Sequence, residues 1–142
     1  MNPELKVTKN IEINADISRV WNALVNPEII KEYLFGTETV TDWKVGSPIV
    51  FQGEYDGKSY QDKGTILQNI PGNLIKYSYW SDMSGLEDKP ENYATITYML
   101  KMVGTKTVLF LEQKGFTNIE SQQHSFKMWD VVLGQLKEIV EG

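Results

Sequence analysis

Cysteine is absent from the 142-residue sequence, and this absence excludes disulfides, thiol nucleophiles and thiolate metal sites. Arginine occurs once, as Arg19, and the formal net charge is −5. Proteins that bind nucleic acids or anionic membranes need clustered Lys and Arg side chains, so the composition argues against both partners. No run approaches about 18 apolar residues, and the segment MNPELKVTKN lacks the apolar centre of a signal peptide. We therefore expect a cytoplasmic protein.

The common catalytic and cofactor motifs are also missing. A nucleophilic triad would need His124, the single histidine, and no G-x-S-x-G motif occurs. The segments GSPIVFQG and GEYDG lack the spacing and the Lys-Ser/Thr ending of phosphate-binding loops. One imidazole without a second His or Cys cannot form a conventional zinc site, and the helical wheel turns His124 toward solvent. We expect no metal, no cofactor and no catalytic residue of these classes.

The composition that remains is that of a globular protein. A length of 142 residues predicts one domain, residues 1–142, and the hydrophobic fraction of 41% argues against disorder. Aromatic residues are plentiful, with four Trp, seven Tyr and five Phe. Large rings fill cores, but they also line apolar pockets, and composition alone does not separate the two roles.

The first third of the sequence predicts a strand and two short helices. Apolar and polar residues alternate over Leu5–Ile13, which is typical of a half-buried strand. Asp16 is a suitable N-cap for a first helix that carries apolar residues on one side. Asn26 and Pro27 then start a second helix, because Asn caps helices and Pro favours their first turn.

Six further strands are predicted after Gly36. Short turns separate them, among them the hairpin turn Asp56-Gly57. The predicted strands are Thr37–Trp43, Pro48–Tyr55, Lys58–Ile70, Leu74–Trp80, Ala94–Met102 and Lys106–Lys114. The connection Ser81–Tyr93 is longer than the others, and acidic residues outnumber basic ones in it. It is either a solvated hairpin tip or a binding loop.

The chain finishes with its clearest helix. Thr117 and Glu120 form a capping-box pattern, and the periodicity predicts a helix that runs to about Glu141. One side of this helix is apolar, with Gly134 on the other side. The apolar stripe contains Phe126, Trp129, Val132, Leu133, Leu136, Ile139 and Val140. Because the sheet is the only apolar surface large enough to cover this stripe, we predict an α+β domain whose curved antiparallel sheet of about seven strands wraps the last helix.

Four segments of the sequence resemble a known family. They are ADISRVWNALVNPEIIKEYLFG, DWKVGSPIVFQGEYDGKSYQDKG, YSYWSDMSGLEDKPENYATITY and HSFKMWDVVLGQLKEIVE. Their order is similar to that of the AHSA-type family, named after the activator of the ninety-kilodalton heat-shock chaperone's ATPase and related to the C-terminal domain of that activator. This family lies within the START-like, birch-pollen-allergen or SRPBCC helix-grip superfamily. The resemblance runs from about Ile11 to Glu141.

The resemblance implies a helix-grip fold with a tunnel between the sheet and the C-terminal helix. Relatives use such tunnels to bind hydrophobic ligands or to cyclise polyketides, and some use them for neither. The co-chaperones that give the family its name bind their chaperone through surface contacts. A small apolar or aromatic molecule and a chaperone or other protein are therefore the partners that the resemblance implies.

Nine residues are candidates for contact with a ligand. They are the strand residues Trp43, Phe51, Tyr60, Asp62, Tyr79 and Tyr98, and the helix residues Gln122, Ser125 and Trp129. Strand alternation predicts that about half of the strand aromatics face inward. Ser and Gln on an otherwise apolar helix face indicate either water or ligand at the site, or the exposed end of the helix. We expect a cavity of at least about 300 Å³ behind Trp129.

Three acidic residues flank one predicted hairpin: Glu54, Asp56 and Asp62. Asp56 belongs to the turn, and the other two face water unless the strand turns them inward. If Asp62 shares a face with Tyr60, Ile66 and Ile70, its carboxyl group is buried and its pKa is raised.

Three functions are compatible with this sequence. The first is non-catalytic binding of a small hydrophobic or aromatic ligand between the sheet and the last helix. The second is an enzyme of the cyclase or dehydratase type, which requires a buried titratable residue that touches a cavity. The third is a protein-interaction domain that regulates a chaperone under stress, with the segment Ser81–Tyr93 as its contact.

Overall fold

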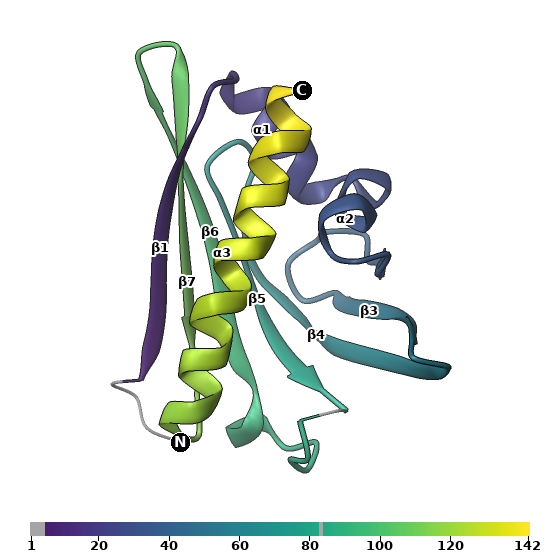
Figure 1. The fold of residues 1–142 in the computed structure, drawn as a ribbon. Helices are drawn as coiled ribbons and strands as arrows, with labels where there is room; N and C mark the ends of the chain where they lie inside the picture. Colours follow the sequence, from purple (N-terminus) through teal and green to yellow (C-terminus); the bar gives the residue numbers. More distant parts are fainter. Residues whose placement is uncertain (1–4, 83) are drawn as a thin grey trace.

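The computed structural model of the chain describes residues 5–82 and 84–142. Residues 1–4 of the N-terminal segment and Met83 of the predicted long connection lie outside the described residues. One strand, two short helices, six strands and a long helix follow one another, as the sequence predicts (Figure 1). Their bounds are β1 Lys6–Ile13, α1 Ile17–Val25, α2 Pro27–Tyr33, β2 Glu38–Val40, β3 Pro48–Tyr55, β4 Lys58–Ile70, β5 Leu74–Ser81, β6 Ala94–Val103, β7 Lys106–Lys114 and α3 Ile119–Glu141.

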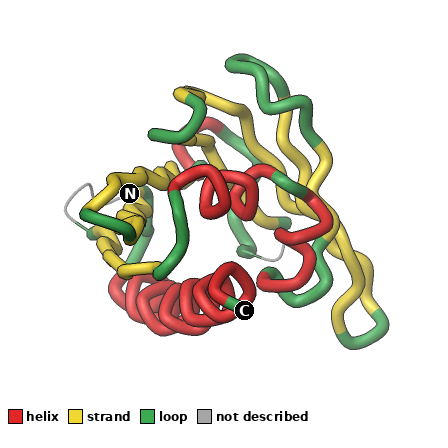
Figure 2. The backbone as a smooth tube through the Cα atoms, turned by 90° about the horizontal axis from the view of Figure 1, so that it is seen from above, coloured by secondary structure: helices red, strands yellow, loops and turns green. Residues whose placement is uncertain are grey.

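The seven strands form one antiparallel sheet in the order β1-β7-β6-β5-β4-β3-β2. The sheet curves around α3, which Figure 2 shows nearly end-on. The short helices α1 and α2 pack against α3. They cover the part of the concave face of the sheet that lies near the C-terminal end of α3 (Figures 1 and 2). The fold is therefore the predicted α+β helix-grip.

The apolar stripe of α3 faces the sheet, as predicted, except at its first residue. Trp129 and Leu136 are buried in the core, whereas Phe126 is 46% exposed. The Nζ atom of Lys9 lies 3.1 Å from the centre of the Phe126 ring, so this ring packs under a cation at the edge of the sheet. The N-cap is Asn118 and not Thr117, because the Asn118 side chain accepts a hydrogen bond from the backbone N–H of Ser121.

The second predicted strand, Thr37–Trp43, is much shorter in the structure. Only Glu38–Val40 pairs with β3, and the chain then leaves the sheet. Trp43 has a φ of 66°, which an extended strand does not allow. Two side chains hold the turn: Asp42 accepts from the N–H of Lys44, and Asn69 donates to the carbonyl of Trp43. The prediction of a long strand was wrong here because the local hydrogen bond of Asp42 and the long-range hydrogen bond from Asn69 stabilise a turn in place of strand pairing.

Strand β4 changes face part-way along its length. Asp62 and Ile66 are buried on the inner face, but Ile70 is 51% exposed. The register with β5 shifts by one residue between Ile66 and Gln68, so the residues beyond this bulge alternate in the opposite phase. The sequence pattern placed Ile70 on the face of Asp62 because it does not reveal the bulge.

The described part of the connection from Ser81 to Tyr93 folds back against the outer face of the sheet. The rings of Trp80 and Tyr93 stack with centroids 6.4 Å apart, and the Trp80 indole donates to the carbonyl of Leu86. Lys63, on the outer face of β4, forms an ion pair with Asp88 at 2.5 Å. These contacts keep Leu86, Asp88 and Tyr93 on the face of the sheet opposite α3.

Candidate functional site

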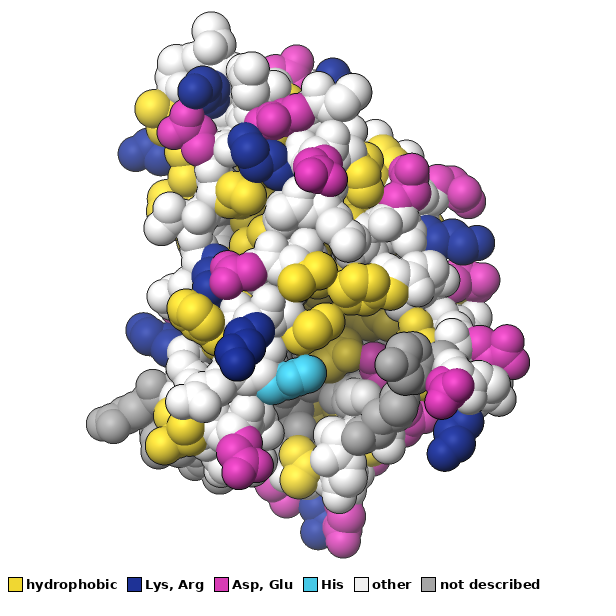
Figure 3. All heavy atoms as spheres, in the orientation of Figure 1, with side chains coloured by type: hydrophobic (Ala, Val, Ile, Leu, Met, Phe, Trp, Pro, Cys, Tyr) yellow, Lys and Arg dark blue, Asp and Glu magenta, His cyan; other side chains and the backbone are white. Residues whose placement is uncertain are grey.

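A cavity of about 310 Å³ lies between the inner face of the sheet and α3. Strands β3 to β7, the first part of α3 and the loop after α2 form its walls. Figure 3 shows a hollow on this side of the molecule, with hydrophobic side chains in its depth. The volume lies at the lower end of the range for ligand pockets and agrees with the expected cavity behind Trp129.

Trp129 forms the wall that α3 contributes. Its indole N–H donates a hydrogen bond to the side-chain oxygen of Gln113 at 2.7 Å, and both residues are buried. The ring of Tyr98 packs edge-on against Trp129, with 5.9 Å between the centroids. Because the polar atom of the indole is satisfied by β7 and its ring is held by β6, Trp129 presents a fixed apolar surface to the cavity.

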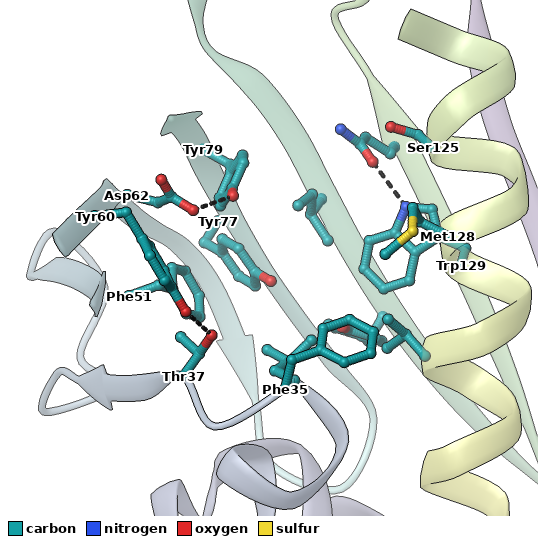
Figure 4. Close-up of a pocket in the computed structure, with 15 residues that line it drawn as sticks. Phe35, Thr37, Phe51, Tyr60, Asp62, Tyr77, Tyr79, Ser125, Met128 and Trp129 are labelled. Atoms are coloured by element: carbon teal, nitrogen blue, oxygen red, sulfur yellow. Dashed lines mark hydrogen bonds between the residues drawn. The ribbon is translucent and has the colours of Figure 1, made fainter. Parts of the chain in front are cut away.

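Asp62 lies on the opposite side of the cavity, on β4 (Figure 4). The hydroxyl of Tyr79 donates to its Oδ2 atom at 2.5 Å, and only 9% of the residue is exposed. Burial raises the pKa of the Asp62 carboxyl, and hydrogen bonds from Tyr79 and Ser81 offset part of this effect. The nearby carboxylate of Asp82 raises the pKa further.

A second hydrogen bond closes the polar side of the cavity. The hydroxyl oxygens of Thr37 and Tyr60 lie 2.5 Å apart, which joins the loop after α2 to β4. The same loop carries Phe35, whose φ of 55° turns it out of the helical path. Figure 4 shows its ring extending toward α3 along the edge of the cavity.

Besides Tyr60, three tyrosines line the sheet side: Tyr77 and Tyr98, which are buried, and Tyr79, which is partly buried. Burial raises the pKa of each phenol above its ordinary value, and for Tyr79 the negative charge of Asp62 raises it further. All three therefore remain neutral at physiological pH. Their hydroxyls can donate or accept hydrogen bonds without adding charge to the cavity.

The sequence matches the family model described as "Activator of Hsp90 ATPase homolog 1-like protein" over residues 14–141. The chain belongs to this family. A comparison with curated proteins gave no match.

Solved structures with this fold include another protein of high sequence similarity. ChR145 from Cytophaga hutchinsonii is 45% identical, with a TM-score of 0.86, and the match covers 99% of this chain and 97% of that one. The Aha1 dimer from Colwellia psychrerythraea is 18% identical, with a TM-score of 0.76 and coverage of 96% of both chains. DynU16, from the dynemicin biosynthetic locus, is 13% identical, with a TM-score of 0.81, and the match covers 98% of this chain and 48% of that one. At such low identity the last two show the shared fold alone.

Seven of the nine predicted ligand-contact residues of this family member line the cavity. They are Phe51, Tyr60, Asp62, Tyr79, Tyr98, Ser125 and Trp129. Asp62 is buried on the inner face together with Ile66, as predicted, whereas Ile70, which the prediction placed on the same face, is exposed beyond the bulge. Whether these residues bind a ligand stays a prediction.

Trp43 and Gln122 lie outside the lining of this cavity. Trp43 borders a separate void of about 10 Å³ beside α1 and α2. The side-chain nitrogen of Gln122 donates to the backbone carbonyl of Lys6, which ties the start of α3 to β1. This contact accounts for a Gln on the apolar side of the helix without any ligand.

Several lining residues were missed, and some of them left a signal in the sequence. Tyr77 and Gln113 occupy inward positions in the alternation of β5 and β7, so extending that pattern would have found both. Met128 adjoins Trp129 on α3. Phe35 and Thr37 left no signal, because they line the cavity through the backbone geometry of a loop.

Other candidate sites receive no support among the described residues. His124, cyan in Figure 3, is exposed, as predicted, and so is Glu54. In the described part of the chain, no three His, Cys, Asp or Glu side chains gather where they could hold a metal ion. No helix in those same ranges has the length and apolar character needed to cross a membrane.

Proposed function

We propose that this protein binds a small apolar or aromatic molecule in the cavity between the sheet and α3. The observation that carries the proposal is a cavity of about 310 Å³ with a fixed indole on one side and aromatic strand residues on the other. Burial of a ligand's apolar surface contributes about 25 cal/mol per Å². The hydroxyls of Ser125 and the tyrosines, together with Asp62, would fix its orientation.

The first test is native mass spectrometry of the protein purified from its own host. We expect the mass of the native protein to include a bound small molecule, and we expect that molecule to be lost when the protein is denatured. A second test is titration with naphthylmethanol, followed by calorimetry. Absence of both retained compound and measurable binding would contradict the proposal.

A matched pair of variants locates the binding site. Val132 lines the cavity and is buried, whereas the neighbouring Val131 is 45% exposed on the other side of α3. Val132→Phe should fill part of the cavity and weaken naphthylmethanol binding at least about tenfold. Val131→Phe adds the same atoms outside the cavity and should leave the affinity unchanged. Equal effects of the two substitutions would place the ligand elsewhere.

Acid–base catalysis is a second candidate, and the pair Asp62–Tyr79 favours it. A desolvated carboxyl group that touches a cavity is the feature that the cyclase or dehydratase hypothesis requires. Titration of the Asp62 carboxyl carbon by NMR tests this feature directly. A pKa in the ordinary range for Asp would remove the basis for this candidate. Regulation of a chaperone stays a prediction from the family resemblance.

A further inference from the structure

The charge of the cavity wall is negative and unbalanced. Asp62 is the only charged side chain among the described residues that line it, and that lining contains no Lys, Arg or His. The next residue, Lys63, points to the outer face, where its Nζ atom lies 2.5 Å from Asp88. Asp82 adds a second negative charge close enough to affect the titration of Asp62. Within the described lining, therefore, nothing neutralises the Asp62 carboxylate.

The carboxyl group of Asp62 also has unused hydrogen-bonding capacity. Tyr79 donates to its Oδ2 atom, and a hydrogen bond from Ser81 also acts on the carboxyl group, but Oδ1 is shielded from solvent and has no hydrogen-bond partner among the described residues. A buried acceptor without a donor costs free energy in the ligand-free protein. A ligand that brings a donor, and above all a positively charged one, recovers that free energy when it binds.

The surroundings of Asp62 are aromatic. Phe51 is its partner across the strand pair, Tyr60 lies two residues earlier on the same face, and Tyr79 donates to it. The rings of Phe51 and Tyr79 have their centroids 5.9 Å apart. Figure 4 shows these three rings around the carboxyl group. The faces of aromatic rings attract cations, so rings and carboxylate favour the same kind of ligand group.

The volume limits the size of the ligand. An apolar cavity of about 150 Å³ holds one benzene ring, so a cavity of about 310 Å³ has room for about two rings. Trp129 offers a flat surface on the side opposite Asp62, suited to an aromatic body, and Tyr98 packs edge-on against its ring.

We propose that the ligand of this cavity is a small aromatic amine, with its ammonium group at Asp62 and its rings against Trp129. This inference rests on the proposed function, because it names the class of molecule that the same cavity binds. The folded protein already bears the cost of removing the Asp62 carboxyl from water. Only the ammonium group therefore has to be desolvated on binding, and the carboxylate and ring faces replace its water. An anionic ligand would meet like charge at the same place.

Three probes of one shape test the proposal by calorimetry at neutral pH: naphthylmethylamine, naphthylmethanol and naphthoate. We expect the amine to bind at least about tenfold more tightly than the alcohol, and naphthoate to bind more weakly than the alcohol. In Asp62→Asn the amine should lose its advantage, so that the affinities of that variant for the amine and for the alcohol differ by less than about threefold. Glu54→Gln removes the same charge from an exposed position of the neighbouring strand and should preserve the tenfold preference.

The outcomes separate this inference from the proposed function. If the alcohol binds and the amine binds no more tightly, the amine assignment is overturned and binding of an apolar molecule stands. If Asp62→Asn keeps the preference for the amine, Asp62 is not its partner. If none of the probes binds, both proposals fail. The ranking of the probes on the unaltered protein needs no variant, so it decides the matter even if Asp62→Asn does not fold.

Discussion

Two tyrosine–aspartate hydrogen bonds lie on opposite faces of the strand pair β4–β5, and their carboxyl groups differ in acidity. On the inner face Tyr79 donates to Asp62, and on the outer face Tyr93 donates to Asp88, both at 2.5 Å. Burial raises the pKa of Asp62. The hydrogen bonds from Lys63 and Tyr93 lower the pKa of Asp88. The same donor–acceptor pair thus has opposite protonation behaviour in the two places.

Strand alternation is the cause of this difference. Asp62 and Lys63 are neighbours in the chain, and β4 turns one side chain inward and the other outward. Lys63 can therefore neutralise Asp88 but not Asp62. A two-residue period is enough to give one face a solvated ion pair and the other a carboxyl group without a counter-ion. That unbalanced carboxyl group is what makes the inner face a candidate binding site.

The largest expected effect follows from adding a methyl group where β4 and β5 approach each other most closely among the glycine positions. A Cβ atom at Gly64 would lie 1.6 Å from the carbonyl oxygen of Ser78 on β5. Gly64→Ala should lower the free energy of unfolding by about 3 kcal/mol, because backbone has to move to make room. Urea denaturation measures this change. Gly134→Ala is the control, since a Cβ there meets nothing within 4 Å, and it should stabilise α3 by about 0.5–1 kcal/mol. A Gly64→Ala variant as stable as the unaltered protein would contradict this account of the strand pair.

The second prediction removes one hydroxyl from each face. Tyr79→Phe removes the phenolic donor from the buried carboxyl group of Asp62 and should lower the free energy of unfolding by about 1–3 kcal/mol. It should also raise the pKa of Asp62 further, because the hydrogen bond favours the carboxylate. Tyr93→Phe makes the same chemical change where water can replace the hydroxyl, so its loss should be much smaller. Urea denaturation measures the free energy of unfolding of both variants. Equal losses of stability would contradict the proposed difference between the two faces.

Most of the residues that line the cavity on the inner face of the sheet could be predicted from the sequence. Tyr79 and Tyr98 follow from strand alternation, and Trp129 follows from the helical period of the apolar stripe. These periods are properties of regular backbone, so they hold wherever the backbone is regular. Asp62 was predicted only conditionally, since alternation alone does not say which of its two phases faces the core.

The parts that could not be predicted depend on irregular backbone or on specific long-range contacts. The bulge in β4 reverses the inward–outward alternation of side chains before Ile70. Positive φ angles change the direction of the backbone at Phe35 and Trp43. Gln122 was predicted to contact a ligand but donates to the backbone of β1. Such features depend on how distant segments meet, and no local period encodes them.

The third prediction concerns the pH dependence of stability. Because the pKa of Asp62 is raised in the folded state, its contribution is fully present below the unfolded pKa and is lost as pH rises through the folded pKa. Asp62→Asn should therefore gain stability relative to the unaltered protein as pH rises from about 3 to 7. Asp88 has a lowered pKa, so its contribution is lost as pH falls, and Asp88→Asn should lose relative stability over the same rise. Urea denaturation across this range gives both curves, and slopes of the same sign would show that the two carboxyl groups do not differ.

The smallest effect comes from removing the cation that distinguishes the two faces. Lys63→Met abolishes the ion pair with Asp88 and should raise the pKa of Asp88 toward its ordinary value. The overall stability should hardly change, because exposed ion pairs contribute little. The pKa of Asp62 should remain almost constant, since Lys63 points away from it through the thickness of the sheet. NMR titration of the carboxyl carbons follows both groups at once, with Lys58→Met as a control for the loss of one charge on the same strand. If the pKa of Asp62 moved as far as that of Asp88, the sheet would not separate the two electrostatic environments, and the unbalanced charge in the cavity would need another explanation.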